Sequence, residues 1–490
     1  MKPLPGKNPL LLAILLLALG ACSSATRYGV SDAEFTSIES SVRGHINTLA
    51  SEEFGGRRPG TQFETLTLDY IESVLANSGY ESGTNDPGNF WRSPVPLFST
   101  KPLDSRIELS MGRRSVVLSS ESSGAYTSRK RGLVEAGSTI FVGRQAQSVP
   151  DEMVRGNVIL MLSEPGKSPG RREVLFGKGA AAIITVVADQ DSMDGVAGFY
   201  GNERIGLAEE DDGRLIAFAT DEAITEALGP AAWGVLKQAV EAGQTEPVEL
   251  DATTTIEANS QRRELRSHNI IGRLPGAKPG SGAVLLLAHW DHFGECGDEG
   301  AEDRLCNGAI DNASGVAVML ELAKRLAQNG PHDRDIYVLG TTAEEWGLLG
   351  TKAFVENPPV PLNEFVAAFN FDTVALAPRG SAIGFVGQGR TPLDEIILST
   401  IERSERPIGD RALADQFINR QDGIILLDEG VPTVVLSNSL GDSELVQSFL
   451  ASKYHQPNDE ADGIELGGAV DDLILHEELV RQLADATLYP

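Results

Sequence analysis

The chain has 490 residues, which at roughly 100–200 residues per domain predicts about two to four domains. Its 41 basic side chains are outnumbered by 70 acidic ones, giving a formal net charge of −29, so we expect no nucleic-acid partner. Three cysteines are too few for a disulfide framework or a cysteine-rich zinc ribbon.

The first residues have the pattern of an export signal. Lys2 and Lys7 precede an apolar run at residues 10–19, which is too short to span a bilayer as a helix. The run is followed by Leu19-Gly20-Ala21-Cys22, which resembles a bacterial lipobox, and by Ser23, which is typical of sorting to the outer membrane. No other stretch approaches 18 apolar residues.

This pattern predicts a lipoprotein signal peptide at residues 1–21 and a lipid anchor to the membrane through Cys22. The protein would be exported and attached to the outer membrane, facing the periplasm or the cell surface. The alternative is an ordinary cleaved signal with an incidental cysteine.

Two helices are predicted after a short tether at residues 22–30. Apolar residues recur at helical spacing over residues 35–49, and Ser31 or Asp32 would cap this helix. A break rich in glycine and charge at residues 51–61 leads to a second amphipathic helix at residues 66–75.

Residues 100–255 have a different pattern. Short strands, a helix feeding a strand and a further helix are predicted at residues 138–142, 157–162, 174–187, 216–219 and 221–228. No histidine or cysteine occurs between Arg131 and Gln261, so we expect no transition-metal site within this region.

From His268 onward, strands and helices alternate. Strands are predicted at residues 269–274, 284–288, 336–341, 365–371, 382–386 and 433–437, and helices at residues 314–327, 345–355, 393–403 and 471–488. Several of the strands are apolar on both faces, as in a sheet covered on both sides. The predicted fold class is therefore α/β, with a mostly parallel central sheet flanked by helices.

Five polar motifs lie between the predicted strands and helices of this region. They are His289-Trp290-Asp291-His292, Asp311-Asn312-Ala313-Ser314-Gly315, Glu344-Glu345, Asn370-Phe371-Asp372 and Tyr454-His455-Gln456-Pro457. At least three follow predicted strands, and ligands bind at the carboxyl ends of the strands in open α/β sheets.

The residue types in these motifs suit a pair of zinc ions. Imidazole nitrogen and carboxylate oxygen are zinc donors, and one carboxylate can bridge two ions about 3.5–4 Å apart. Two metals need about five ligands, which His289, Asp311, Glu345, Asp372 and His455 supply. Glu344 is then left over as a general base.

Each residue also has a structural explanation. A single histidine at a strand end is more often a hydrogen-bonded loop residue, and paired glutamates at a helix start are favourable for the helix dipole. Asp311 could simply cap a helix, and Asp372 could be a turn residue. For His292 we favour the structural role. Five such explanations falling together into one ordered set are far less plausible than a metal centre.

The ordered set resembles the M28 metallopeptidases, which are co-catalytic di-zinc exopeptidases and mostly aminopeptidases. The resemblance implies the zinc exopeptidase, phosphorylase/hydrolase-like fold over residues 31–104 and 259–490. Residues 105–258 resemble an inserted, β-rich α+β protease-associated (PA) domain.

The resemblance also implies two Zn²⁺ ions per chain and a role for each ligand. His289 and Asp372 would bind one zinc, Glu345 and His455 would bind the other, and Asp311 would bridge both.

Two further side chains would assist catalysis. Asp291 would hydrogen-bond the imidazole of His289, and Glu344 would act as general base on a metal-bridged water. The family commonly has a cis peptide after the bridging aspartate, here Asp311–Asn312.

The expected function is that of a zinc-dependent aminopeptidase that hydrolyses N-terminal residues from peptides. The alternatives are a carboxypeptidase or dipeptidase of the same family and, further removed, glutaminyl cyclase-type chemistry or a catalytically inactive binding protein. The sequence leaves the preferred terminal residue and the oligomeric state open.

Cys296 and Cys306 are predicted to form a disulfide. The export signal directs the chain to an oxidising compartment, where thiols that can meet usually pair, and Cys22 would be taken up by lipid. The alternatives are two unpaired thiols, or zinc ligands in place of the assigned residues.

Overall fold

The computed structural model describes residues 29–85, 90–244, 246–297 and 300–490. The predicted signal peptide and Cys22 lie outside these residues. Within them, no helix combines the length and the apolar character needed to cross a bilayer. The chain divides into two compact units, one comprising residues up to Val95 together with Ser267–Pro490 and the other Pro96–Arg266. The predicted insert, residues 105–258, lies inside the second unit.

The first unit begins with the two predicted helices. Helix α1 (Asp32–Leu49) starts at Ser31, whose hydroxyl accepts a hydrogen bond from the backbone N of Glu34. Helix α2 (Gln62–Asn77) follows a 3-10 segment, η2 (Glu52–Arg57), that fills the predicted break. Both helix predictions are confirmed.

The sheet of the first unit runs in the order β16-β17-β15-β11-β14-β10. Its strands are β10 (Val248–Leu274), β11 (Ala283–His289), β14 (Asp335–Thr341), β15 (Phe365–Asn370), β16 (Gly384–Val386) and β17 (Thr433–Ser437). Strand β11 is parallel to β14 and β15, and β15 is parallel to β17. Strands β10 and β16 are antiparallel to their neighbours, so the predicted mostly parallel sheet is confirmed.

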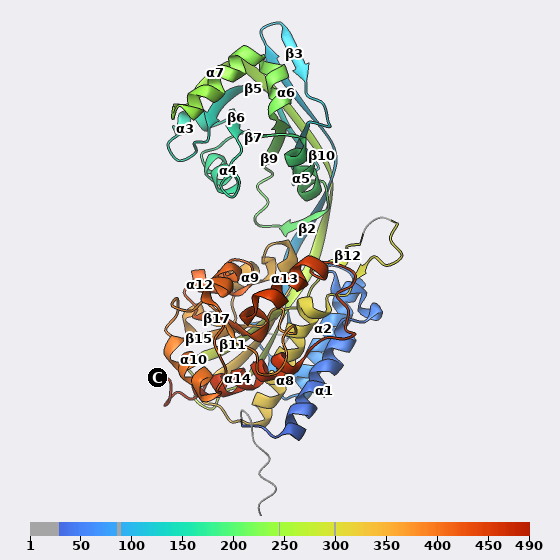
Figure 1. Cartoon of the computed structure of the whole chain (residues 1–490), viewed down its shortest axis with the longest axis vertical. Helices are drawn as coiled ribbons and strands as arrows, with labels where there is room; N and C mark the ends of the chain where they lie inside the picture. The colour runs from blue at the N-terminus through green and yellow to red at the C-terminus, as the bar shows by residue number, and fades with distance from the viewer. Residues whose placement is uncertain (1–28, 86–89, 245, 298–299) are drawn as a thin grey trace, which may run out of the picture. The chain divides into compact units, whose positions relative to one another are not determined.

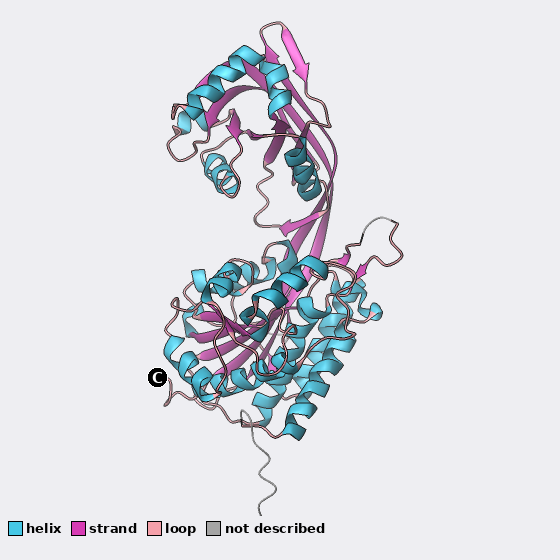
Figure 2. Ribbon diagram, viewed as in Figure 1, coloured by secondary structure: helices cyan, strands magenta, loops and turns pink. Residues whose placement is uncertain are grey.

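Helices lie on both sides of this sheet, as Figure 2 shows. Alternate side chains of β11 enter two different cores, with Leu286 on one face and Leu287 on the other. The first face packs against α1, α2, α8 (Gly315–Gln328) and α14 (Gly467–Leu483) (Figure 1). The second face packs against α9 (Leu349–Glu356) and α12 (Gly423–Asp428).

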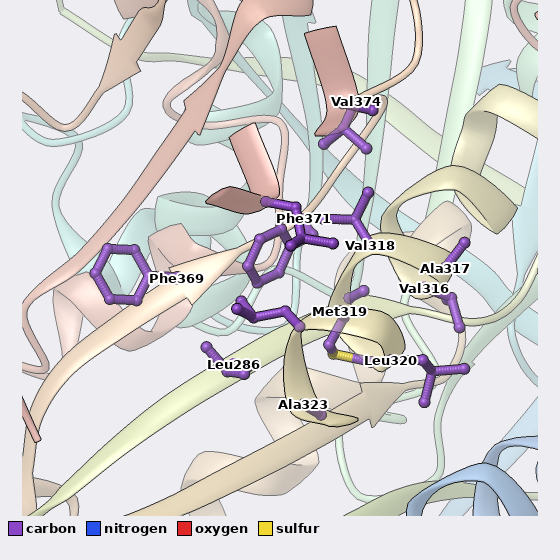
Figure 3. Packing of buried hydrophobic residues seen from close by; sticks show 14 of the residues in the cluster. Leu286, Val316, Ala317, Val318, Met319, Leu320, Ala323, Phe369, Phe371 and Val374 are labelled. Atoms are coloured by element: carbon purple, nitrogen blue, oxygen red, sulfur yellow. The ribbon is translucent and has the colours of Figure 1, made fainter. Parts of the chain in front are cut away.

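Helix α8 is buried almost all round. Figure 3 shows its residues Val316 and Met319 in one packed cluster with Leu286 of β11 and Phe369 of β15. Burying a side chain of this size contributes about 1.5–3 kcal/mol relative to leaving it exposed. The cluster therefore anchors the segment just before α8, which carries Asp311.

One predicted helix is divided. The run at residues 345–355 forms a 3-10 turn, η4 (Glu344–Trp346), and then α9. Gly347 and Leu348 separate them with φ values of 113° and 61°, and left-handed backbone cannot continue a right-handed helix. Helix α14 also ends at Leu483, before the predicted residue 488.

The second unit has hydrophobic cores of its own. Parallel strands β5 (Arg131–Gly143), β6 (Val158–Leu162), β7 (Ala182–Val187) and β9 (Leu215–Thr220) are adjacent in that order. Strand β4 (Ser123–Thr127) and the first part of β10 pair antiparallel at its two sides.

The helices of the second unit are α3 (Asp151–Val154), α4 (Ser168–Gly177), α5 (Gln190–Tyr200), α6 (Asp221–Leu228) and α7 (Pro230–Glu241). Strand β2 (Arg92–Met111) pairs with β3 (Arg114–Val117) and β8 (Arg204–Leu207). Because β2 and β10 are long strands, the boundaries of the unit lie within them at residues 96 and 266.

Candidate metal centre

The predicted ligands converge at one edge of the sheet in the first unit. His289 is the last residue of β11, Glu344 and Glu345 follow β14, and Asp372 follows β15. These strands are parallel, so their carboxyl ends meet at the same edge. Asp311 arrives from a π-helical turn, η3 (Ala309–Ser314), that leads into α8.

Three carboxylates surround the imidazole of His289. Its Nε2 lies 3.4 Å from Oδ1 of Asp311, 3.8 Å from Oδ1 of Asp372 and 4.0 Å from Oε2 of Glu344. His289, Asp311 and Asp372 bring one donor atom each into a group compact enough to hold a metal ion.

A second group shares Asp311. Nε2 of His455 lies 3.4 Å from the other oxygen of Asp311, Oδ2, and 3.0 Å from Oε2 of Glu345. This nitrogen is buried and makes no hydrogen bond of acceptable geometry. An orphaned imidazole nitrogen between two carboxylates fits a metal ligand better than a hydrogen-bonding partner.

His292 lies at the same centre. Its Nδ1 is 2.5 Å from Oε1 of Glu345, and together with Asp311 and Glu345 it forms another group able to hold an ion. Nε2 of His292 is also buried without a hydrogen-bond partner among the described residues. We favour His455 as the ligand, because its Nε2 lies within 3.4 Å of both Asp311 and Glu345, whereas the described ion pairs of His292 involve Glu345 alone. In that arrangement His292 would orient Glu345.

Asp291 is placed differently from the expectation. Its carboxylate Oδ1 lies 3.9 Å from Nδ1 of His289, too far for a hydrogen bond. The backbone carbonyl of Asp291 lies 3.2 Å from that Nδ1 instead, and Oδ1 accepts a hydrogen bond from the backbone N of Glu344. Burial raises the pKa of Asp291 to about 8.

The electrostatics of the centre indicate a shortage of positive charge. Burial alone lowers the pKa of His289, but Glu344, Asp311 and Asp372 raise it well above its usual value. His455 behaves in the same way, its pKa rising to about 9.

The pKa of Glu344 is also raised well above its usual value, by burial first and by neighbouring carboxylates second. Divalent cations would supply the charge that these side chains lack.

Arg57 is a residue that the sequence analysis missed. Its fully buried guanidinium donates hydrogen bonds to the carbonyl oxygens of Trp290, Asn307, Gly308 and Leu49 at 2.6–2.9 Å. It therefore ties α1 to the segments beside His289 and Asp311. An arginine within a loop carries no periodic signal, and only its place in the Gly-Gly-Arg-Arg break set it apart.

Asp459 was also missed. Its carboxylate accepts hydrogen bonds from the backbone N of Ile310 and Asp311 at 3.0–3.1 Å, and burial raises its pKa to about 6. It lies four residues after His455, so one loop supplies a candidate ligand and the carboxylate that holds the backbone of Asp311.

The loop between the first two motifs contains a disulfide joining Cys296 and Cys306. Sγ of Cys296 lies 3.3 Å from the carbonyl oxygen of His455. The peptide bond between Asp311 and Asn312 is cis, as the resemblance implied.

A cavity that is open to solvent reaches the candidate centre. His289, Asp311, Glu344 and Asp372 form its polar end. The rest of the lining is mainly an apolar wall of Leu376, Phe417, Val435, Leu440, Val446, Phe449 and Leu450, with Thr373, Arg420, Gln421 and Tyr454 beside them.

Parts of the chain are similar to known proteins. Residues 269–473 match the family described as peptidase family M28. The chain is 24% identical to the "probable lipoprotein aminopeptidase LpqL" of Mycobacterium tuberculosis, over 71% of this chain and 61% of that protein. It is 34% identical to aminopeptidase YwaD of Bacillus subtilis over 22% of each chain.

The fold is similar to that of the aminopeptidase from Aneurinibacillus sp. strain AM-1. The TM-score is 0.56 at 17% sequence identity, covering 91% of this chain and 94% of that one.

Proposed function

Since the chain carries a domain of peptidase family M28, we propose that it is a zinc-dependent exopeptidase of the aminopeptidase type that uses two zinc ions. One observation carries this proposal. The two carboxylate oxygens of Asp311 face two different histidines, His289 and His455, each beside a further carboxylate. Such a set of nitrogen and oxygen donors suits a pair of zinc ions bridged by one aspartate.

When bound, the ions would supply Lewis-acid chemistry to the scissile carbonyl group and make a nearby water more acidic. His289 and Asp372 would hold one ion, and Glu345 and His455 the other. Glu344, whose side chain is 11% exposed and lines the cavity, would take a proton from the attacking water and deliver it to the leaving amine. Asp291 would position that base through its hydrogen bond to the backbone N of Glu344.

The polar end of the cavity favours an amino terminus. It is lined by carboxylates, which attract a protonated α-amine and repel an α-carboxylate. The apolar wall would receive the side chain of the terminal residue, so we expect leucine and phenylalanine to be preferred over aspartate and lysine.

Arg420 keeps the carboxypeptidase or dipeptidase alternative open. It lines the same cavity, stacks over the rings of Phe417 and Tyr454, and forms no ion pair with any carboxylate in the part of the chain that is described. A cation there could bind the carboxylate of a short substrate.

Matched substrates test the proposal. Leucine p-nitroanilide should be hydrolysed, N-acetyl-leucine p-nitroanilide should not, and a chelator should abolish turnover that added zinc restores. Cleavage of N-blocked dipeptides with a free C-terminus, without cleavage of leucine p-nitroanilide, would favour a carboxypeptidase. Metal analysis of the purified chain should find two zinc ions.

We further propose that the chain is an exported lipoprotein anchored through Cys22 and that its second unit is a PA-like insert. The name of the Mycobacterium tuberculosis relative supports the first point, and the compactness of Pro96–Arg266, which has hydrophobic cores of its own, supports the second. Mass spectrometry of the N-terminal peptide should detect acyl chains on Cys22, and Cys22→Ala should release the protein from the membrane fraction.

A further inference from the structure

The second unit contains a buried arginine whose charge no carboxylate offsets. Arg172 lies on the face of α4 that packs toward the sheet, and 8% of its surface is exposed. Its guanidinium donates hydrogen bonds to the hydroxyls of Tyr200 at 3.2 Å and Thr185 at 3.5 Å, and lies over the ring of Phe218. Among the described residues, Arg172 has no carboxylate partner in an ion pair.

An unpaired buried charge is costly, and buried charges in proteins are normally paired. The same helix shows the ordinary arrangement one residue earlier, where Arg171 pairs with Glu164 at 2.8 Å. Apolar side chains would be expected at the position of Arg172, because that face of an amphipathic helix is directed at the core. The exception makes Arg172 a candidate for binding an anion from outside the chain.

Arg172 borders a cavity that could admit such a partner. The cavity has a volume of about 460 Å³, opens to solvent and lies wholly within the second unit. Its walls include Tyr126 and Tyr200, whose stacked rings have their centroids 5.1 Å apart. Arg204, a second arginine without an ion pair in the described ranges, stacks over Phe199 at 4.4 Å and over Tyr200 at 5.0 Å.

The carboxylates that line the cavity do not neutralise Arg172. Glu173 pairs with Arg214 at 2.5 Å, and Asp211 pairs with Arg262 at 2.7 Å. Asp212 also pairs with Arg214, so these three carboxylates are engaged by other arginines. The cavity therefore combines aromatic walls with two arginines that are open to an anion.

We propose that this cavity is a second binding site, which captures a carboxylate group of a peptide. Arginine binds carboxylates through two parallel hydrogen bonds, so Arg172 would hold the carboxylate while Arg204 adds positive charge at the mouth. The aromatic walls would pack against the side chain beside it. A strongly acidic chain repels polyanions, and the choice of a peptide as ligand rests on the proposed peptidase function.

The carboxylate could belong to a C-terminus or to an aspartate or glutamate side chain, and three probes separate these sources. Calorimetric titration of the full, zinc-loaded chain would use N-acetyl-Gly-Phe, N-acetyl-Gly-Phe-amide and N-acetyl-Glu-Phe-amide. Binding of the first alone indicates a C-terminal carboxylate, and binding of the third alone indicates an acidic side chain. All three probes are blocked at the amino terminus, so the proposed aminopeptidase reaction does not consume them.

Arg172→Gln should weaken binding of the carboxylate probe about tenfold or more, since a charge-assisted hydrogen bond is lost. Arg171→Gln is the matched control, because it removes an arginine of the same helix that is already paired, and it should change binding less than twofold. Arg172→Lys keeps the positive charge but lacks the two parallel N–H donors of the guanidinium, so it should show an intermediate loss of probe affinity. Arg204→Gln, at an exposed position, should weaken binding about two- to threefold.

Three outcomes would overturn the site. They are equal binding of the acid and both amides, equal effects of Arg171→Gln and Arg172→Gln, and undiminished binding in Arg172→Gln, which would locate the probe at the metal centre. If Arg172→Gln does not fold, weaker probe binding in Arg204→Gln and Arg172→Lys is the result that supports the site, and unchanged binding in both rejects it. All variants should hydrolyse leucine p-nitroanilide at the wild-type rate, because none of the changed residues lies at the metal centre. If the wild-type chain binds the probe but shows no peptidase activity, the proposed function is rejected and the second binding site stands.

Discussion

Asp311 is the residue on which both halves of the candidate metal centre depend. Its two carboxylate oxygens face different histidines, and its backbone N is held by Asp459. Asp372, by contrast, contacts only the group around His289. This difference predicts how many metal ions each substitution removes.

Asp311→Asn should therefore lose both zinc ions, whereas Asp372→Asn should lose one. An amide is a weaker donor than a carboxylate and does not offset the charge of a cation. Metal content of the purified variants by elemental analysis checks this. Two zinc ions bound to the Asp311→Asn variant would reject the bridging assignment.

Glu344 should act as a base without holding metal. Glu344→Gln should keep the wild-type zinc content and lose about 10²–10⁴-fold in turnover, the usual contribution of a general acid–base group. Glu356→Gln, at an exposed position on α9, provides the control and should leave turnover unchanged. Near-normal turnover in the Glu344 variant would remove it from this role.

His476 should make the first unit sensitive to acid. It is fully buried against Phe369 and Phe371, and burial lowers its pKa to about 4 from an ordinary 6.5. The unfolded chain therefore binds a proton between about pH 6.5 and pH 4 that the folded chain does not, so stability falls as the pH falls through this window.

At 1.36 kcal/mol per pKa unit, the loss of folding stability caused by His476 reaches about 3 kcal/mol once the pH has fallen to about 4. Thermal melting of His476→Met and wild type from pH 7 to pH 4 tests this, and the variant should lose less stability. Parallel losses in both proteins would show that other groups set the acid sensitivity.

At the level of elements, the loop between β11 and η3 is constrained by the Cys296–Cys306 disulfide. Closing a loop of about 10 residues stabilises a chain by about 2–3 kcal/mol through the unfolded state. Because Sγ of Cys296 also contacts the carbonyl oxygen of His455, the loop supports a candidate ligand.

The double variant Cys296→Ser/Cys306→Ser should melt at a lower temperature and bind the zinc beside His455 more weakly. A chelator competition assay measures the second effect, with a thiol reductant on the wild-type chain as a chemical control. Unchanged zinc affinity would limit the disulfide to a role in stability.

Considered as a whole, the molecule keeps every candidate ligand in one of its two units. The cores of the first unit consist of residues outside Pro96–Arg266, and the backbone N of Ile271 donates a hydrogen bond to the carbonyl of Trp91. The two segments that flank the second unit in sequence are thus adjacent within the first.

Replacing residues 96–266 with a short Gly/Ser linker should yield a chain that folds, binds zinc and hydrolyses leucine p-nitroanilide. It should no longer bind N-acetyl-Gly-Phe at the cavity of Arg172. Cooperative melting, zinc content and turnover are the measurements. Aggregation of the shortened chain would show that the first unit needs the second to fold.

The sequence alone was sufficient where the signal is local. Apolar periodicity located α1 and α2, runs of apolar residues located the parallel strands, and five ordered motifs predicted which side chains would meet. Strand ends of a parallel sheet converge by topology, so the grouping of His289, Glu345 and Asp372 followed from strand order without any knowledge of distances.

Only the tertiary structure decided the features that depend on contacts between distant segments. Arg57 forms three of its hydrogen bonds, and Asp459 forms those to Ile310 and Asp311, with backbone groups more than 140 residues away, which no local pattern encodes. The carboxylate of Asp291 accepts a hydrogen bond from the backbone N of Glu344, whereas the backbone carbonyl of Asp291 faces Nδ1 of His289. Arg172 looks like an ordinary helical arginine in sequence, and its unpaired burial emerges only when the helix packs against its sheet.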